Sequence, residues 1–97
     1  MIEIPFQDIK VLCDKYAVRR LMLFGSALRD DFNQNSDIDL LVEYQPTANV
    51  TLLDMAALQR ELSIVFQRRV DLGTPRSLRY MRDEVLNSAQ VIYEQAG

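Results

Sequence analysis

Residues 20–44 read RLMLFGSALRDDFNQNSDIDLLVEY, and this stretch decides the fold. It begins with a short apolar run, RLMLF, that Gly25 ends, which is typical of a buried strand closed by a turn. Residues 38–44, IDLLVEY, form the strongest strand pattern in the sequence. Residues 26–36 should begin with a helical turn and end in a polar loop, so that the second strand can return beside the first.

The apolar spacing outside this stretch predicts further helices and strands that alternate along the chain. We expect a first helix beginning near Pro5 and a second from Thr51 to about Phe66, with Thr51 and Asp54 forming a capping box. A strand at 69–72 and a last helix capped by Ser77 should follow. Residues 91–93 should form either a short edge strand or a continuation toward the C-terminus. This order implies an α/β (α+β) fold, a short mixed sheet of three to four strands with helices packed on it.

The composition bounds the class of protein. The chain has 97 residues, so we expect one domain, 1–97, and its hydrophobic share of 48% is enough for a core. Its net charge of −3, from 14 acidic and 11 basic residues, gives no electrostatic footprint for nucleic acid. No segment reads as a signal peptide or a membrane span, so we expect a soluble cytoplasmic protein.

Cysteine and histidine usage narrow the possible chemistry. Cys13 is the one cysteine, so no internal disulfide can form, and its place in the apolar pattern of the first helix predicts a buried packing residue. The chain contains no histidine, which excludes serine–histidine triads, histidine-based ribonuclease chemistry and histidine-rich zinc sites.

Asp37 and Asp39 lie two residues apart at the start of the second predicted strand. Alternation along a strand places both carboxylates on one face, and Ile38 and Leu40 on the other. Two neighbouring anions repel each other unless a cation offsets the repulsion, and carboxylate oxygens are ligands that Mg²⁺ and Mn²⁺ prefer. The pair predicts a divalent metal site; the alternative is a strand edge whose carboxylates only face water.

Gly25 and Ser26 follow the first predicted strand directly and open a turn. Glycine allows close approach of the backbone, and exposed N–H groups together with the Ser26 hydroxyl can hold a phosphate. Ten residues separate Ser26 from Asp37, enough for the two strands to pair. The phosphate-holding turn would then lie beside the carboxylates, as binding a metal-bound triphosphate requires.

The segment 23–44, LFGSALRDDFNQNSDIDLLVEY, resembles the signature of the DNA polymerase β-like nucleotidyltransferase superfamily, in which Gly-Ser is followed ten residues later by Asp-x-Asp. The resemblance extends over essentially the whole chain. It implies a small nucleotidyltransferase fold and a two-metal reaction that transfers a nucleotide from a triphosphate, with loss of pyrophosphate.

This resemblance also implies roles for particular carboxylates. Asp37 and Asp39 would hold the metal ion that binds the nucleotide. Asp71, in the segment RRVDLGTP, would complete a second metal site and help to deprotonate the attacking hydroxyl. Without the resemblance, a single Asp at a strand end would be interpreted as a turn residue.

The loop between the first two strands holds the remaining candidates. Gly25 and Ser26 would bind phosphate, and Arg29 would either pair with phosphate oxygens or brace the loop through a nearby carboxylate. Asp30 stands where family members often carry glycine, and it adds negative charge near the phosphates. Ser36 is interpreted as a turn residue.

Two further groups of residues are interpreted as structural. The basic segment 68–82 is a solvated surface, with docking to an acidic partner or to nucleotide phosphate as the alternative. The four tyrosines are interpreted as packing residues: Tyr16, Tyr44, Tyr80 and Tyr93.

The absence of a substrate-recognition domain makes the chain similar to the minimal nucleotidyltransferase antitoxins. That resemblance implies a type VII-like toxin–antitoxin pair, in which the protein associates with a HEPN toxin encoded nearby and transfers AMP from ATP to a tyrosine of the toxin. Fold alone does not fix function, and two alternatives stand beside this one. The first is a non-catalytic module that neutralises its partner by contact, and the second is an enzyme that acts on a small hydroxyl-bearing molecule.

Overall fold

The computed structural model describes residues 3–25, 37–74 and 89–95. Their elements follow in the order α1 (Phe6–Lys15), β1 (Val18–Phe24), β2 (Ile38–Tyr44), α2 (Leu52–Phe66), β3 (Val70–Gly73) and β4 (Gln90–Glu94). Each predicted strand and helix that falls on these residues is present, and the boundaries of β2 are those that the sequence predicted. The loop 26–36 and the helix expected from Ser77 lie outside the described residues.

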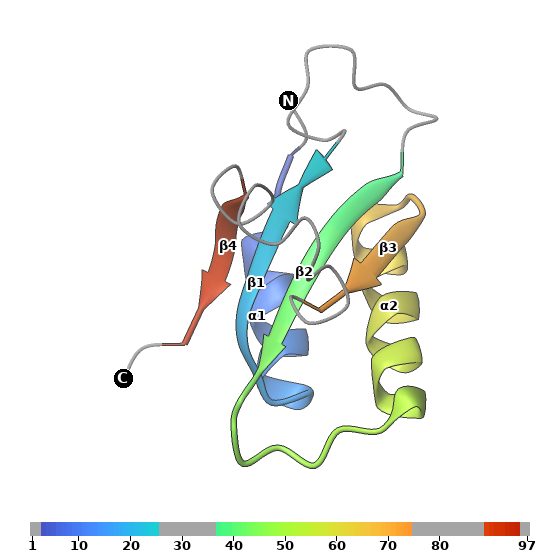
Figure 1. The fold of residues 1–97 in the computed structure, drawn as a ribbon. Helices are drawn as coiled ribbons and strands as arrows, with labels where there is room; N and C mark the ends of the chain where they lie inside the picture. The colour runs from blue at the N-terminus through green and yellow to red at the C-terminus, as the bar shows by residue number, and fades with distance from the viewer. Residues whose placement is uncertain (1–2, 26–36, 75–88, 96–97) are drawn as a thin grey trace.

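The four strands form one mixed sheet in the order β3-β2-β1-β4 (Figure 1). β1 pairs antiparallel with both β2 and β4, whereas β2 and β3 are parallel. The parallel pair requires a crossover, which α2 supplies between β2 and β3. The segment expected at 91–93 is an edge strand, β4. The fold is therefore α+β, with the four-stranded mixed sheet that the sequence predicted.

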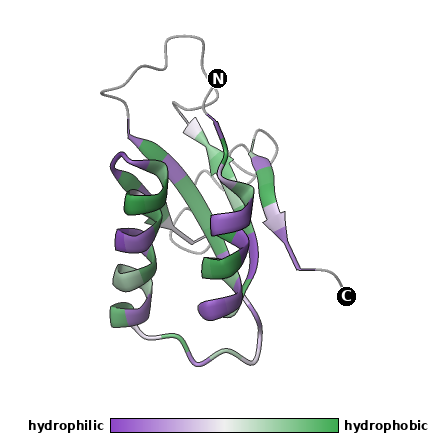
Figure 2. Cartoon of the chain, turned by 180° about the vertical axis from the view of Figure 1, so that it is seen from behind, coloured by the Kyte–Doolittle hydropathy of each residue, from purple (hydrophilic) through white to green (hydrophobic). Residues whose placement is uncertain are grey.

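Both helices lie on one face of the sheet, which Figure 2 shows from behind. The core fills the space between them and the sheet, because alternate residues of β2 and β3 point toward the helices. Each element contributes buried side chains to this core, and those of every element except β4 include fully buried ones: Ile9, Cys13, Leu21, Leu23, Ile38, Leu40, Val42, Leu58, Leu62 and Val70. No helix among the described residues covers the opposite face of the sheet, which we call the open face, although Met22 and Leu41 are buried on it.

The start of α2 confirms the predicted capping box. The Oγ1 of Thr51 accepts the backbone N–H of Asp54 at 3.2 Å, and the Oδ2 of Asp54 accepts the backbone N–H of Thr51 at 3.0 Å. Two donors that a helix end leaves unpaired are thereby satisfied. This cap fixes where α2 begins, and so fixes which of its turns lie beside β3.

The apolar spacing of the sequence predicts broad apolar helix faces that include Phe6, Val11, Leu52 and Leu53, but the faces that the helices bury are narrower. Leu52 and Leu53 are 86% and 82% exposed, and Phe6 and Val11 of α1 are also exposed. The stripe that α2 buries consists of Leu58, Leu62 and Phe66, spaced four residues apart. Turning by about 100° per residue carries Leu52 and Leu53 to other sides of the helix. None of the helices in the described part of the chain has the length and apolar character to cross a membrane.

Cys13 is buried as predicted, at 0% exposure. Desolvation, reinforced by the charge of Asp14, raises the pKa of the Cys13 thiol to about 12. Because the thiolate is the reactive form, the folded protein should leave a thiol-specific reagent almost unconsumed at pH 8, and should react fully in denaturant. Spectrophotometric titration with and without guanidinium measures this, and rapid reaction of the native protein would contradict the buried position.

Candidate active site

The end of β1 and the start of β2 meet at one edge of the open face. Phe24 pairs with Asp39 in the antiparallel register, so Gly25, the next residue, lies beside the Asp39 carboxylate. A Cβ atom on Gly25 would be 2.5 Å from the Oδ2 of Asp39, and the backbone there has a φ of +72°. Glycine alone among the amino acids meets both conditions without strain. Gly25 therefore allows close approach of the backbone, as predicted, and the group that approaches it in the structure is the Asp39 carboxylate.

Asp71 lies directly opposite Asp39 across the parallel pair β2–β3. Adjacent strands are about 4.8 Å apart, so the two residues are immediate neighbours. Ile38 and Leu40 on β2, and Val70 and Leu72 on β3, are buried in the helix-side core. Alternation then turns Asp39 and Asp71 to the open face, where Asp39 is half-buried and Asp71 exposed. Two aspartates distant in the sequence thus occupy adjacent positions on one face of the sheet.

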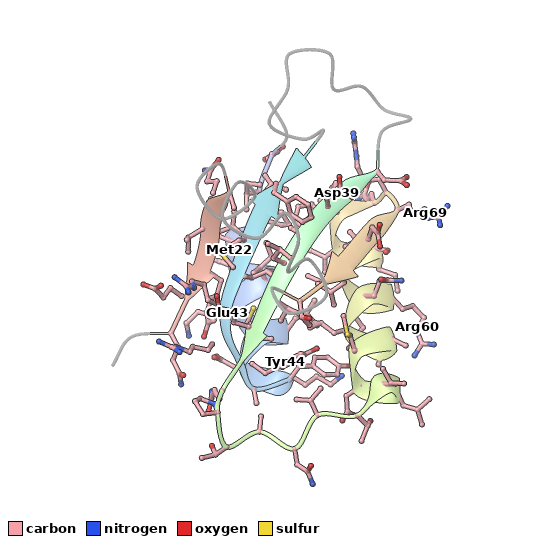
Figure 3. All side chains as sticks on the ribbon, viewed as in Figure 1. Met22, Asp39, Glu43, Tyr44, Arg60 and Arg69 are labelled. Carbon is pink, nitrogen blue, oxygen red and sulfur yellow. The ribbon has the colours of Figure 1, made fainter. Side chains whose placement is uncertain are left out.

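Asp37, the third predicted ligand, precedes β2 and is exposed. Its Oδ2 is 3.9 Å from the Nε of Arg69, the residue that leads into β3. Figure 3 shows Asp39 and Arg69 at the same end of the sheet. Within residues 3–25, 37–74 and 89–95, no three Asp, Glu, His or Cys side chains form a group able to hold a metal ion. The three-carboxylate metal site therefore stays a prediction, with Asp39 and Asp71 already in register.

Arg20 and Glu43 occupy the other end of the open face, and sequence reasoning did not single them out. They pair across β1 and β2, with the Nη2 of Arg20 2.7 Å from the Oε1 of Glu43. Met22 and Leu41 lie between this ion pair and Asp39 and are almost fully buried. Only the strand register reveals the pairing, since 23 residues separate its members. The Nη1 of Arg20 also lies 3.7 Å from the Oε2 of Glu94 on β4, so one guanidinium pairs with two carboxylates at this end.

The tyrosines in the described part of the chain pack against the core, as predicted. The hydroxyl of Tyr16 donates to Glu61 of α2, and this hydrogen bond lowers the pKa of the Glu61 carboxyl. The hydroxyl of Tyr93 donates to Asp14 at 3.2 Å. Burial raises the pKa of Tyr44. The Tyr16 contact joins the end of α1 to α2, and the Tyr93 contact joins β4 to α1.

Several predicted residues lie outside the described residues: Ser26, Arg29, Asp30 and Ser36 in the first loop, and Tyr80 and most of the basic segment beyond Gly73. Of that basic segment the structure describes Arg68 and Arg69, and Arg69 is exposed at the edge of the acidic end. The phosphate-binding part of the predicted site stays a prediction for this reason.

Residues 7–96 match the family described as Polymerase beta, Nucleotidyltransferase. The chain therefore belongs to this nucleotidyltransferase family, and the membership that the segment 23–44 indicated is confirmed.

The chain is also similar in sequence to one relative and in structure to two solved proteins. The chain is 38% identical over 88 residues to a predicted protein adenylyltransferase of Methanocaldococcus jannaschii, which covers 90% of this chain and 91% of the relative. It is 34% identical to a predicted minimal nucleotidyltransferase of known structure, with a TM-score of 0.72 over 87% of this chain and 85% of the other.

The second structure is a tri-AMPylated HEPN toxin of Shewanella oneidensis in complex with an MNT antitoxin. It matches with a TM-score of 0.65 and 20% identity, and the match covers 93% of this chain and 70% of that one. At this identity, the likeness concerns the fold.

Proposed function

We propose that this nucleotidyltransferase is the antitoxin of a type VII-like pair and transfers AMP from ATP to a tyrosine of a HEPN toxin. The observation that carries the proposal is the register of Asp39 with Asp71, next to the glycine turn that ends β1. A carboxylate pair beside a glycine that ends a strand suits displacement at a phosphorus atom. Support for the protein acceptor comes from the adenylyltransferase relative and from the toxin–antitoxin complex with the same fold.

The donor chemistry at this end of the sheet fits Mg²⁺, with Mn²⁺ as an alternative ion. Hard carboxylate oxygens are its preferred ligands, and the missing side chain at Gly25 lets the carboxylate of Asp39 lie directly against the end of β1. We infer that Asp37, Asp39 and Asp71 would hold the ions. Bound metal would supply charge neutralisation for the attacking and leaving oxygens.

In the proposed reaction the tyrosine hydroxyl oxygen forms a bond to the α-phosphorus of ATP. The bond between the α-phosphorus and the oxygen bridging to the β-phosphorus breaks, and pyrophosphate leaves with that electron pair. Asp71, exposed at the sheet edge, can accept the hydroxyl proton. We assign phosphate binding to Gly25 and Ser26, and assign Arg29 either to the phosphates or to bracing the loop.

We further propose that the protein acts in the cytoplasm as a hetero-oligomer with its toxin. The buried, unpaired thiol of Cys13 suits a reducing compartment. We propose that the interface with the toxin recognises the acceptor, because the described residues form one sheet with two helices and no separate element for binding a substrate.

The test uses the protein, Mg²⁺ and the product of the neighbouring gene, which we propose is the HEPN toxin. With ATP labelled at the α-phosphate, we expect the label on the HEPN protein, and with ATP labelled at the γ-phosphate we expect none, because that label leaves with pyrophosphate. Mass spectrometry should place the AMP on tyrosine, and replacing that tyrosine by phenylalanine should abolish labelling.

Two results would overturn the assignment. Tight inhibitory binding without an adduct would indicate a module that acts by contact. Labelling of a small hydroxyl-bearing compound in place of the HEPN protein would indicate a different acceptor class. An Asp71→Asn variant that labels the HEPN protein at the wild-type rate would remove Asp71 from the reaction.

A further inference from the structure

β3 is an edge strand of only four residues, and it carries Asp71. Short edge strands fray readily, since one side of their backbone has no strand partner. On its inner side β3 pairs with β2, where the N–H of Ile38 donates to the carbonyl of Arg69 at 2.9 Å. In this parallel register the N–H groups of Val70 and Leu72 point away from β2. These are the amides on either side of Asp71.

Both outward amides are accepted by side chains of α2. The N–H of Val70 donates to the Oγ of Ser63 at 3.1 Å, and the N–H of Leu72 donates to the Oε1 of Gln59 at 3.0 Å. The Ser63 hydroxyl donates in turn to the backbone carbonyl of Gln59 at 2.9 Å. Because its hydrogen points to that carbonyl, the hydroxyl oxygen of Ser63 presents its lone pairs to β3. Two polar side chains of one helix thus replace the missing strand.

The spacing of the two acceptors matches the spacing of the two donors. Gln59 and Ser63 are one helical turn apart, which is about 6 Å along α2. Val70 and Leu72 are two strand residues apart, which is about 6.6 Å along β3. Both contacts therefore form together without bending β3, and the residue between the two amides, Asp71, has its backbone held from both sides.

We propose that Gln59 and Ser63 are positioning residues for nucleotidyl transfer. By accepting the amides of Val70 and Leu72, they hold Asp71 opposite Asp39, so that both carboxylates could contact one divalent cation. This inference rests on the proposed function for the role of Asp71. The core also anchors Val70 and Leu72 through their side chains, at 1% and 6% exposure, and the two hydrogen bonds from α2 add to this anchoring.

The experiment replaces the acceptor atom and preserves the shape of the side chain. Gln59→Met removes the acceptor, Gln59→Glu restores one, and Gln7→Met on the exposed surface of α1 is the matched control. The readouts are the Mn²⁺ affinity of each protein without nucleotide, measured by electron paramagnetic resonance, and the hydrogen exchange of the Val70 and Leu72 amides. In a second pair of variants, Ser63→Ala removes the hydroxyl that accepts the Val70 amide, and Ser63→Thr restores a hydroxyl.

We expect Gln59→Met to speed exchange of the Leu72 amide and to weaken Mn²⁺ binding roughly 10-fold, the size of effect seen when a partner that orients a metal ligand is removed. Gln59→Glu should recover most of the affinity, and Gln7→Met should match the wild type. In an Asp71→Asn background, Gln59→Met should cause no further loss of Mn²⁺ affinity, because the carboxylate on which it acts is gone.

Unchanged Mn²⁺ affinity in Gln59→Met, with faster Leu72 exchange, would overturn the inference, as would an equal further loss in the Asp71→Asn background. A general loss of folding would instead lower amide protection throughout the sheet, and the milder Ser63→Ala variant would then decide. A wild-type protein that binds Mn²⁺ but transfers no AMP to the HEPN protein would defeat the proposed function alone. Failure of the wild type to bind Mn²⁺ would defeat the positioning role.

Discussion

Asp39→Asn is expected to lower kcat/KM for nucleotidyl transfer by about 10³-fold or more, because Asp39 is the one carboxylate in register with both the glycine turn and Asp71. Asparagine has the same shape but lacks the negative charge that a divalent cation requires. The loss should appear in the adenylylation assay at saturating Mg²⁺. It should also appear as a loss of Mn²⁺ binding.

The fold of the Asp39→Asn variant should survive. Asp39 is half-buried on the open face, and removing its charge relieves repulsion with its acidic neighbours. Thermal melts without metal and with millimolar Mg²⁺ measure this, and Mg²⁺ should raise the melting temperature of the wild type alone. Asp8→Asn, on the exposed surface of α1, is the control and should keep full activity. A large loss of stability without metal would assign Asp39 a structural role instead.

Gly25→Ala is expected to reduce activity by about 100-fold, the effect of displacing a reacting group by roughly 1 Å. The new Cβ would meet the Oδ2 of Asp39 at 2.5 Å, so the carboxylate must move. The φ of +72° adds backbone strain, and together these effects should cost on the order of 1–3 kcal/mol in the free energy of unfolding. Stopped assays and urea unfolding measure the two losses separately.

The chain contains a control for the backbone part of this cost. Ala17 has a φ of 56°, so Ala17→Gly reports what an alanine costs in left-handed backbone away from the carboxylates. A Gly25→Ala change in an Asp39→Ala background should show a penalty of that size alone, because the opposing oxygen is absent. An equal penalty in both backgrounds would show that the close contact between Gly25 and Asp39 has no energetic consequence.

Much of the fold follows from local sequence pattern. The alternation in residues 38–44 gave the bounds of β2, and the spacing of Thr51 and Asp54 gave the start of α2. These features depend on neighbours in the chain, whose geometry the backbone fixes within one turn or one pleat. The exposure of Leu52 and Leu53 could not be predicted from the sequence. Hydrophobicity shows that a residue can be buried, but the element that packs against a helix decides which of its faces is buried.

The candidate site divides in the same way. The sequence by itself determined which residue types are present: a glycine turn after a strand, an Asp-x-Asp pair on one face of the next strand, and an aspartate in a later strand. Alternation also assigned Asp39 to the face opposite Ile38 and Leu40, which the buried core confirms. From spacing alone, Asp71 would be interpreted as a turn residue. Only the family resemblance predicts that it is a metal ligand.

The tertiary structure alone decided how these residues meet. The pairing of β2 with β3 sets Asp71 opposite Asp39, the pairing of β1 with β2 sets Gly25 against the Asp39 carboxylate, and α2 brings Gln59 and Ser63 to the amides around Asp71. Strand register is a relation between segments distant along the chain. It is selected by the burial of whole faces, because a slip of one residue would turn Ile38, Leu40, Val70 and Leu72 out of the core.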